Sequence, residues 1–388
     1  MTATTLDCSD IDQYLGKPVC PAPMNDPFSN TDIRRWVQAM HYPNRLHYDK
    51  DYAAEGTYAK LVAPQSFAVA MDDGHGSSPA CVGSIPGSHL LFGGDEWWFY
   101  GPRIFGGDVV SNERIPFDYA VKETKFAGPT CFQRGDNFYR NQHGELIAKQ
   151  RSTAIRYKAD AGREATPMEN TEEPAWTDAE LKAIEDRKFG WIQMLHDLGH
   201  DKRYWDDVTV GDALPERVIG PHSIVSFATE WRSYLFTGWG TITRRTDLDM
   251  AAMGFVEEMA GLEQDPTMER INPELTDGAY IGPSRGHMFK RWAQFIGMPR
   301  EYGYGASMGA WIVDYMAGWA GEHGMVVHSV ANYRGPALVG DITVMTAEVI
   351  DKLVDDEGRH LVQVDFRMKN QLGVTMATAK AEIQLPTR

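Results

Sequence analysis

The chain has 388 residues, of which 43% are hydrophobic and 24% charged, a balance typical of globular proteins, and its length favours two domains. Its formal net charge of −16 argues against nucleic-acid binding through a general electrostatic field, but leaves room for a local basic groove that binds a small anion. No apolar run is long enough to span a membrane, and the start, MTATTLDCSD, lacks the regions of a secretory signal. The four cysteines are scattered, so we expect free thiols, no zinc site and a cytoplasmic location.

The first predicted element is a helix over residues 32–40, DIRRWVQAM, whose apolar side chains recur at the spacing of one buried helix face. Pro43 and Asn44 then end this helix, and His47 falls on the loop that follows. Two interpretations of His47 are open. It is either a proton-transfer group held beside a packed element, or a residue that caps or packs the turn.

Residues 158–190 are polar and acidic and are expected to form a linker that runs into a helix from about Thr177. The run Thr177-Asp-Ala-Glu180 supports that helix start as a capping box. Residues 306–321, ASMGAWIVDYMAGWAG, are apolar nearly all round and predict a buried central helix. Because strands of period two follow it, we expect a sheet wrapped around this helix.

The ends of the two halves of the chain resemble each other. RNQHGELIAKQRSTAIRY (140–157) and KNQLGVTMATAKAEIQLP (369–386) share a basic residue, Asn-Gln, one further residue and Gly. Both predict a strand, a tight turn at the Gly and a second strand. Upstream of each hairpin, a Gly-Asp pair precedes a strand-like segment, from residue 106 and from residue 340.

The repeat extends toward the start of each half. The first helix finds a counterpart in residues 222–231, HSIVSFATEW, where we pair Ile33 and Trp36 with Ile224 and Phe227. His47 and His287 are each followed six residues later by an alanine. Because four landmarks recur in the same order, a gene duplication is the economical explanation.

These segments resemble the MaoC-like hydratase/dehydratase family, the relatives of (R)-specific enoyl-CoA hydratases, whose motif is Gly-Asp-x-Asn-Pro-(Leu/Ile/Val)-His, five residues, and Ala or Ser. The chain keeps the family residue at Asn44, Leu46, His47 and Ala53. It departs at His41, Tyr42 and Arg45, which stand where the family has Gly, Asp and Pro. LVAPQSF (61–67) also resembles the segment that opens the central helix of the N-terminal fatty-acid-synthase-type dehydratase domain.

The resemblance implies an α+β double hotdog fold, in which two antiparallel sheets, each wrapped round a central helix, form a pseudo-dimer. We expect an N-terminal hotdog domain over residues 1–160, an acidic linker and helix over 161–200, and a C-terminal hotdog domain over 201–388. The C-terminal domain is expected to carry an insertion at about residues 240–280.

The family's hydration chemistry implies an Asp and a His that flank the substrate double bond and share the proton transfers. Neither half keeps this pair, because Tyr42 replaces the Asp in the first half and counting along the helix places Ser233 there in the second. The catalytic candidates are the two histidines, possible substitutes for the carboxylate, and neighbours in the motif: His47, His287, Glu230, Asp49, Asn44 and Tyr42.

Candidate substrate-binding residues come from three places. Gly305 and Ala306 open the buried helix, whose first N–H groups could stabilise a thioester oxygen, although Gly305 could equally serve only the entry turn. Arg285, with Lys290, could bind a CoA phosphate. Trp97 and Trp98 in EWWFYGPR could line an acyl pocket, form a dimer contact or pack in the core.

The resemblance therefore implies an enoyl-CoA hydratase or 3-hydroxyacyl-CoA dehydratase that acts on an unusual, bulky acyl group. No metal or redox cofactor is implied, since CoA is part of the substrate. The expected partner is this small-molecule thioester, without nucleic acid or membrane, in a monomer or homodimer. Two alternatives stay open: a non-catalytic acyl-CoA-binding or partner subunit, and another lyase or thioesterase reaction on the same scaffold.

Overall fold

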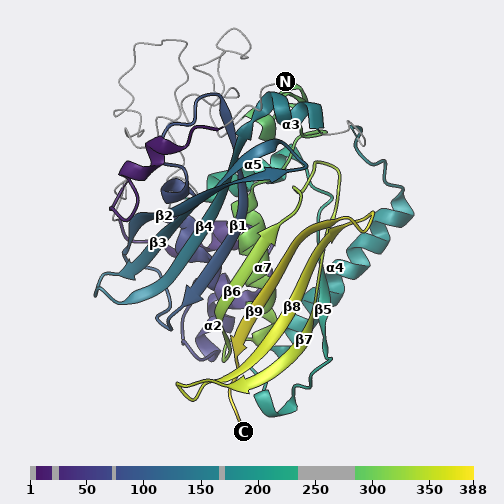
Figure 1. Ribbon diagram of the computed structural model, residues 1–388. Helices are drawn as coiled ribbons and strands as arrows, with labels where there is room; N and C mark the ends of the chain where they lie inside the picture. Colours follow the sequence, from purple (N-terminus) through teal and green to yellow (C-terminus); the bar gives the residue numbers. More distant parts are fainter. Residues whose placement is uncertain (1–5, 20–25, 72–75, 166–170, 235–284) are drawn as a thin grey trace.

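The computed structural model describes residues 6–19, 26–71, 76–165, 171–234 and 285–388 (Figure 1). The nine described strands form one antiparallel sheet in the order β2-β3-β4-β1-β6-β9-β8-β7-β5. They are β1 (Ser88–Phe99), β2 (Val110–Thr124), β3 (Gly128–Asn141), β4 (Leu146–Lys158), β5 (Ala213–Ile219), β6 (Met325–Tyr333), β7 (Thr343–Val354), β8 (His360–Asn370) and β9 (Thr375–Gln384). The four strands β1–β4 come from the first half of the chain and the other five from the second.

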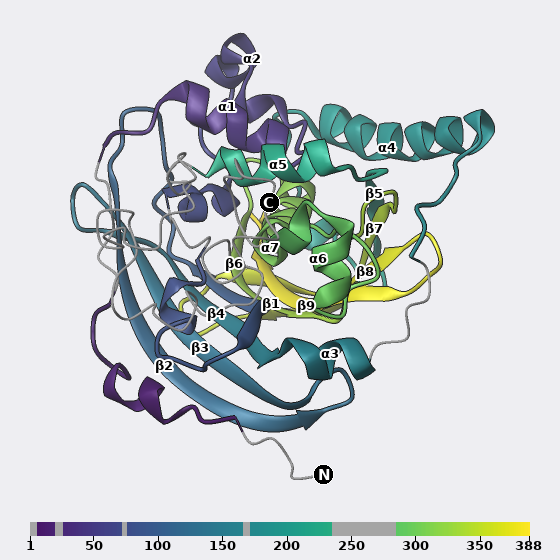
Figure 2. The same cartoon turned by 90° about the horizontal axis from the view of Figure 1, so that it is seen from above.

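The sheet curves around helix α7 (Gly305–Ala320), and α1 and α5 lie on the other side of that helix (Figure 2). The remaining helices are α1 (Asn30–Ala39), α2 (Lys50–Glu55), α3 (Ala159–Ala165), α4 (Asp178–Leu198), α5 (Ile224–Ser233) and α6 (Lys290–Phe295). Nearly every side chain of α7 is buried, which confirms the predicted central helix and explains why its sequence is apolar all round. None of the described helices is both long and apolar enough to cross a membrane.

Capping boxes fix the starts of two predicted helices, α4 where the sequence placed it and α1 at Asn30, two residues before the predicted range of 32–40. In α1 the Ser29 hydroxyl accepts from the Asp32 N–H, and the Asp32 carboxylate accepts in return from the Ser29 N–H. In α4 the predicted capping box forms between Thr177 and Glu180. Helix α1 ends at Ala39 and buries its apolar face, as the spacing of residues 32–40 predicts.

The hydrogen bonds confirm the internal repeat. In the β3–β4 turn the Asn141 side-chain oxygen accepts two backbone N–H groups, and Asn370 does the same in the β8–β9 turn. Each turn also has a glycine in the left-handed region, with φ of 80° at Gly144 and 76° at Gly373. The next glutamine in each turn donates to the aspartate of the Gly-Asp pair upstream, in the pairs Gln142–Asp108 and Gln371–Asp341.

The pairing of α1 with α5 needs a correction of three residues. Ser29 and Ser223 are the N-caps of the two helices, so Ile33 corresponds to Phe227 and Trp36 to Glu230. A helix face repeats every three to four residues, and apolar spacing therefore cannot distinguish registers that differ by three. With this register the counterpart of Tyr42 is residue 236 rather than Ser233, and it lies outside the described residues.

The two half-sheets are joined edge to edge, rather than each enclosing a helix of its own. Strand β1 pairs antiparallel with β6, from Gly94 opposite Asn332 to Trp98 opposite His328. In the first half the described residues hold a short 3-10 helix, Gln65–Met71, at the place of the central helix. The domain boundaries at residues 160 and 200 stay a prediction, and the predicted insertion at 240–280 lies outside the described residues.

We expect the repeated turns to contribute equally to stability. Replacing Asn141 or Asn370 by Ala removes the acceptor of two turn N–H groups and should lower the free energy of unfolding by about 1–2 kcal/mol in each case. Urea unfolding measures this, with Asn332→Ala, an exposed position in β6, as the control. A loss no larger than in the control would contradict the role of these side chains.

Candidate active site

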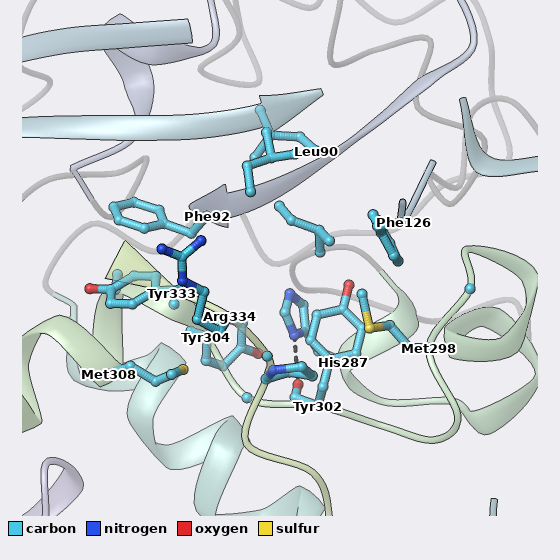
Figure 3. Close-up of a pocket in the computed structure, with 18 of the residues that line it drawn as sticks. Leu90, Phe92, Phe126, His287, Met298, Tyr302, Tyr304, Met308, Tyr333 and Arg334 are labelled. Atoms are coloured by element: carbon cyan, nitrogen blue, oxygen red, sulfur yellow. Dashed lines mark hydrogen bonds between the residues drawn. The ribbon is translucent and has the colours of Figure 1, made fainter. Parts of the chain in front are cut away.

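A cavity of about 450 Å³ lies between the first half of the sheet and the start of α7 (Figure 3). Its first-half wall is mostly apolar, with side chains from β1, from the β2–β3 hairpin and from β4: Leu90, Leu91, Phe92, Phe126, Phe132 and Ile155. The hydroxyl groups of Ser77, Thr124 and Thr130 complete this wall. Its second-half wall carries sulfur and aromatic side chains together with His287: Met298, Tyr302, Tyr304, Met308 and Tyr333. The site therefore draws on both repeats.

His287 is the titratable imidazole in this wall. It ends a 3-10 helix, Arg285–His287, and its ring packs against Tyr302 and Tyr304, with centroids 4.3 Å from each. Its Nδ1 lies 2.7 Å from the carbonyl oxygen of Tyr302 (Figure 3). A carbonyl can only accept, so Nδ1 carries the proton and Nε2 holds the lone pair of the neutral ring. In Figure 3 Nε2 points away from that carbonyl, toward the first-half wall.

The start of α7 forms the floor beside His287. Gly305 and Ala306 line the cavity, and no side chain caps the helix at Tyr304. The first N–H groups of an α-helix have no partner within the helix, and the helix dipole is positive at this end. A Cβ on Gly305 would lie 2.4 Å from the Cβ of Phe92, so glycine is required for this close approach of the two walls.

His47 has the same local geometry but a different environment. It ends the 3-10 helix Arg45–His47, and its Nδ1 lies 2.7 Å from the carbonyl oxygen of Val62, fifteen residues later, as Tyr302 is fifteen residues after His287. Its side chain is only 2% exposed and does not line the cavity. Burial lowers the pKa of His47 to about 3, so this ring is neutral at physiological pH.

The other candidates from the first-half motif surround His47 without reaching the cavity. Asn44 caps the 3-10 helix through its oxygen, and its amide donates to the Tyr42 hydroxyl at 3.2 Å. Tyr42 is buried, and burial together with the nearby Asp314 raises its pKa far above the usual value. Asp49 caps α2 and forms an exposed ion pair with Arg45 at 2.8 Å. The motif residues are thus held together by helix caps and packing.

Glu230 is buried in α5 and does not line the cavity. One of its oxygens lies 3.6 Å from Nε2 of His41, at the end of α1. Burial raises the pKa of Glu230, and His41 opposes that change. The carboxylate therefore contacts the first repeat at the interface between α1 and α5.

The remaining candidates also lie away from the cavity. Arg285 is buried, with its guanidinium 5.5 Å from the Phe289 ring, and Lys290 pairs with Glu172 at 2.9 Å. Trp97 stacks on Phe99 in the core, whereas Trp98 stacks on His328 on the opposite face of the sheet. Neighbouring residues of a strand point to opposite faces, so both tryptophans could not have lined one pocket.

Sequence reasoning missed the first-half wall and Arg334, a cation that lines the cavity just after β6. Phe92 lies in β1, Phe126 in the β2–β3 turn and Phe132 in β3, and nothing in their local spacing indicates that they meet. Arg334 stands in the segment YRGP (333–336), which has a counterpart in FYGP (99–102) of the first repeat. Comparing these two segments would have singled out Arg334 as a charge that the first repeat lacks.

Residues 15–150 match the family model of the FAS1-like dehydratase domain region. The fold is similar to a MaoC-like dehydratase, with 16% identity, 97% of this chain and 100% of that chain covered, and a TM-score of 0.60. It is also similar to a MaoC domain protein from Chloroflexus aurantiacus J-10-fl (12% identity, 100% of both chains, TM-score 0.57). The fold is similar as well to a protein from Mycobacterium tuberculosis with a double hotdog fold (11% identity, 97% of both chains, TM-score 0.52). No curated protein matches the chain.

The resemblance to the MaoC-like hydratase/dehydratase family is confirmed. The double hotdog fold is confirmed with it, as one α+β structure whose two half-sheets are continuous. Within this MaoC-like fold, the second repeat presents its histidine to a cavity and the first repeat buries its own.

The buried His47 predicts a specific pH dependence of stability. The pKa of His47 is about 3 in the folded state and 6.5 in the unfolded state. Below pH 6.5 the unfolded state therefore binds a proton at His47 that the folded state does not bind, and the free energy of unfolding decreases as the pH falls. The difference in unfolding free energy between the wild type and His47→Gln should shrink by about 2 kcal/mol between pH 7.5 and pH 5. Urea unfolding across this range measures it, with the exposed His143→Gln as control. A difference that stays constant would contradict the burial of a neutral ring.

Proposed function

We propose that the protein is a hydratase/dehydratase that interconverts an enoyl-CoA and a 3-hydroxyacyl-CoA with a bulky, apolar acyl group. The observation that carries this proposal is that His287 and the uncapped start of α7 line the same apolar cavity. An imidazole base and a group of N–H donors are the two elements that addition of water to an α,β-unsaturated thioester requires.

In the direction of hydration, Nε2 of His287 accepts a proton from water while the water oxygen forms a bond to the β-carbon. The electrons of the double bond move onto the thioester, whose oxygen gains negative charge and is stabilised by the N–H groups of Gly305 and Ala306. The imidazolium then donates its proton to the α-carbon, and the neutral ring is restored. The backbone carbonyl of Tyr302 accepts a hydrogen bond from Nδ1 and keeps this nitrogen protonated, so the lone pair of the neutral ring stays on Nε2.

This mechanism assigns proton transfer to His287 alone among the described residues. The counterpart of the family's Asp is residue 236 when counted from the start of α5 and Gly282 when counted back from His287, and both lie outside the described residues. Asp49 and Glu230 lie away from the cavity and have no part in the proposed step. Because only water and a proton are exchanged, the reaction calls for no metal or redox cofactor, and CoA enters as part of the substrate.

The first repeat then serves as the acyl-binding half. Its strands present Leu90, Phe92, Phe126, Phe132 and Ile155 to the cavity, a wall that favours a hydrophobic group larger than a short linear chain. Its own histidine is enclosed. The chain therefore acts as a single pseudo-dimer whose described residues place one motif histidine at a cavity, and association into a homodimer stays a prediction.

A second candidate function is a non-catalytic acyl-CoA-binding subunit. It is favoured by one observation, the absence of the family carboxylate at Tyr42 and its counterpart. Such a protein would bind the thioester in the same cavity without turnover.

The deciding test compares His287→Gln with His47→Gln on enoyl-CoA substrates from short linear to polycyclic. Loss of the enoyl-thioester absorbance should proceed with the wild type and, within a few-fold, with His47→Gln. We expect kcat to fall about 10²- to 10⁴-fold in His287→Gln, because the acid/base group is lost. Equal losses in both variants would contradict the assignment to the second repeat. Binding without turnover by the wild type would favour the binding subunit.

A second test addresses the start of α7. In Gly305→Ala the new methyl group would clash with Phe92, so the helix N-terminus and the acyl wall must move apart. We expect kcat to fall about 10²-fold, as expected when oxyanion donors are misplaced. Gly190→Ala, at a helical position of α4 with no atom within 4 Å, is the matched control and should keep full activity. Unchanged kcat in Gly305→Ala would remove the N–H groups from the mechanism.

A further inference from the structure

We propose that Arg334 binds an anionic group of the acyl-CoA substrate at the cavity, an assignment that rests on the proposed function and deepens it. The shared chemistry is an oxyanion that a guanidinium can bind. Its two sources are a phosphate of the CoA moiety and a carboxylate at the far end of the acyl group.

The position of Arg334 is fixed from its backbone. It directly follows β6, and the N–H groups of Arg334 and Gly335 both donate to the carbonyl oxygen of Met376 in β9, at 2.7 and 3.1 Å. The side chain leaves this anchored point and extends toward Phe92 on the opposite wall (Figure 3). The backbone of Arg334 is therefore fixed beside the cavity, and its side chain reaches the lining from this point.

Arg334 is the one lysine, arginine, aspartate or glutamate among the described residues that line the cavity. Over the described part of the chain, its guanidinium has no hydrogen bond, ion pair or aromatic ring partner. Its side chain is exposed and so open to a ligand, whereas Arg300, which is only 2% exposed, pairs with Asp341 inside the protein. The described lining holds no Asp or Glu, so an anion that binds Arg334 meets no repelling carboxylate in the cavity.

The repeat shows that the fold does not need this arginine. In the first repeat the same strand end reads Phe99-Tyr-Gly-Pro102, and the N–H of Tyr100 donates to the carbonyl of Ile147 at 3.0 Å, as Arg334 donates to Met376. Tyr100 is 48% exposed. One turn therefore accepts either residue, and the charge in the second repeat is explained by a ligand rather than by the turn.

The cations that the sequence indicated for a phosphate cannot take this role. Arg285 is 1% exposed and does not line the cavity, and Lys290 extends to Glu172 on the surface. Arg334 offers a planar fork of donors at the cavity itself, which can bind a phosphate or carboxylate through two parallel hydrogen bonds.

The experiment uses two variants of the full chain. Arg334→Gln removes the charge, and Arg334→Tyr installs the residue that the first repeat carries on the same turn, so at least one should fold. Arg367→Gln, an exposed arginine on the outer face of β8 paired with Asp365, is the matched control. Turnover is measured on an enoyl-CoA, on the pantetheine thioester of the same acyl group, which lacks phosphate, and on each of these with a terminal carboxylate.

We expect both Arg334 variants to raise KM about 10- to 100-fold, the effect of losing a charge-assisted pair, while kcat changes less than about threefold. If the anion is a CoA phosphate, the wild type and the Arg334 variants should have equal KM values for the pantetheine thioesters. If the anion is a carboxylate of the acyl group, the wild type should have the lower KM for both thioesters that carry the carboxylate, with CoA or pantetheine, and for neither thioester that lacks it. Unchanged KM with all four substrates would overturn the proposal.

Equilibrium binding separates this proposal from the proposed function. Calorimetric titration with a saturated acyl-CoA, which cannot be hydrated, measures Kd without turnover. Weaker binding by both variants, with an inactive wild type, would keep Arg334 as the anion site and reject the hydratase. Equal Kd values with an active wild type would keep the hydratase and reject Arg334.

Discussion

The pairing of β1 with β6 is the interaction on which the candidate site depends. Because these strands are antiparallel, residues that precede Gly94 in β1 lie beside residues that follow Asn332 in β6. This register brings Phe92 of the first repeat next to Tyr333 of the second, with ring centroids 6.0 Å apart. A Cβ on Gly94 would lie 2.5 Å from the carbonyl oxygen of Ala331, so the junction also needs glycine at its edge. A cavity built from both repeats follows from this one pairing.

The same junction fixes α7 against the sheet. Asp95, buried in β1, accepts from the Tyr333 hydroxyl and from the Gln150 amide, each at 2.7 Å. Gly309 of α7 lies so close that a Cβ there would be 2.3 Å from the Asp95 carboxylate. Asp95 is only 4% exposed, and this burial raises its pKa to about 7 although its hydrogen bonds oppose the change. The start of α7 therefore has a set position relative to the first-half wall.

Local patterns predicted the parts of this fold that local physics determines. Capping residues such as Thr177 and the apolar face of residues 32–40 located helices, and the Asn-Gln-x-Gly turns located both hairpins. The union of the two half-sheets depends on strands more than two hundred residues apart, which leave no local pattern. The same holds for the cavity. The motif named both His47 and His287 as candidates. Only the folded structure, in which His47 is buried, shows that His287 is the histidine at the cavity.

The charge of the chain places a further constraint on an anionic substrate. A net charge of −16 repels a CoA thioester at long range, but at physiological ionic strength this field is screened beyond about 8 Å. Binding is then decided by the charges at the cavity, where the lining carries Arg334, the positive end of α7 and no carboxylate among the described residues. An acidic surface and an anion-binding site are compatible for this reason. The repulsion lowers the rate at which an anionic substrate associates with the protein. It does not affect the contacts that hold the bound anion.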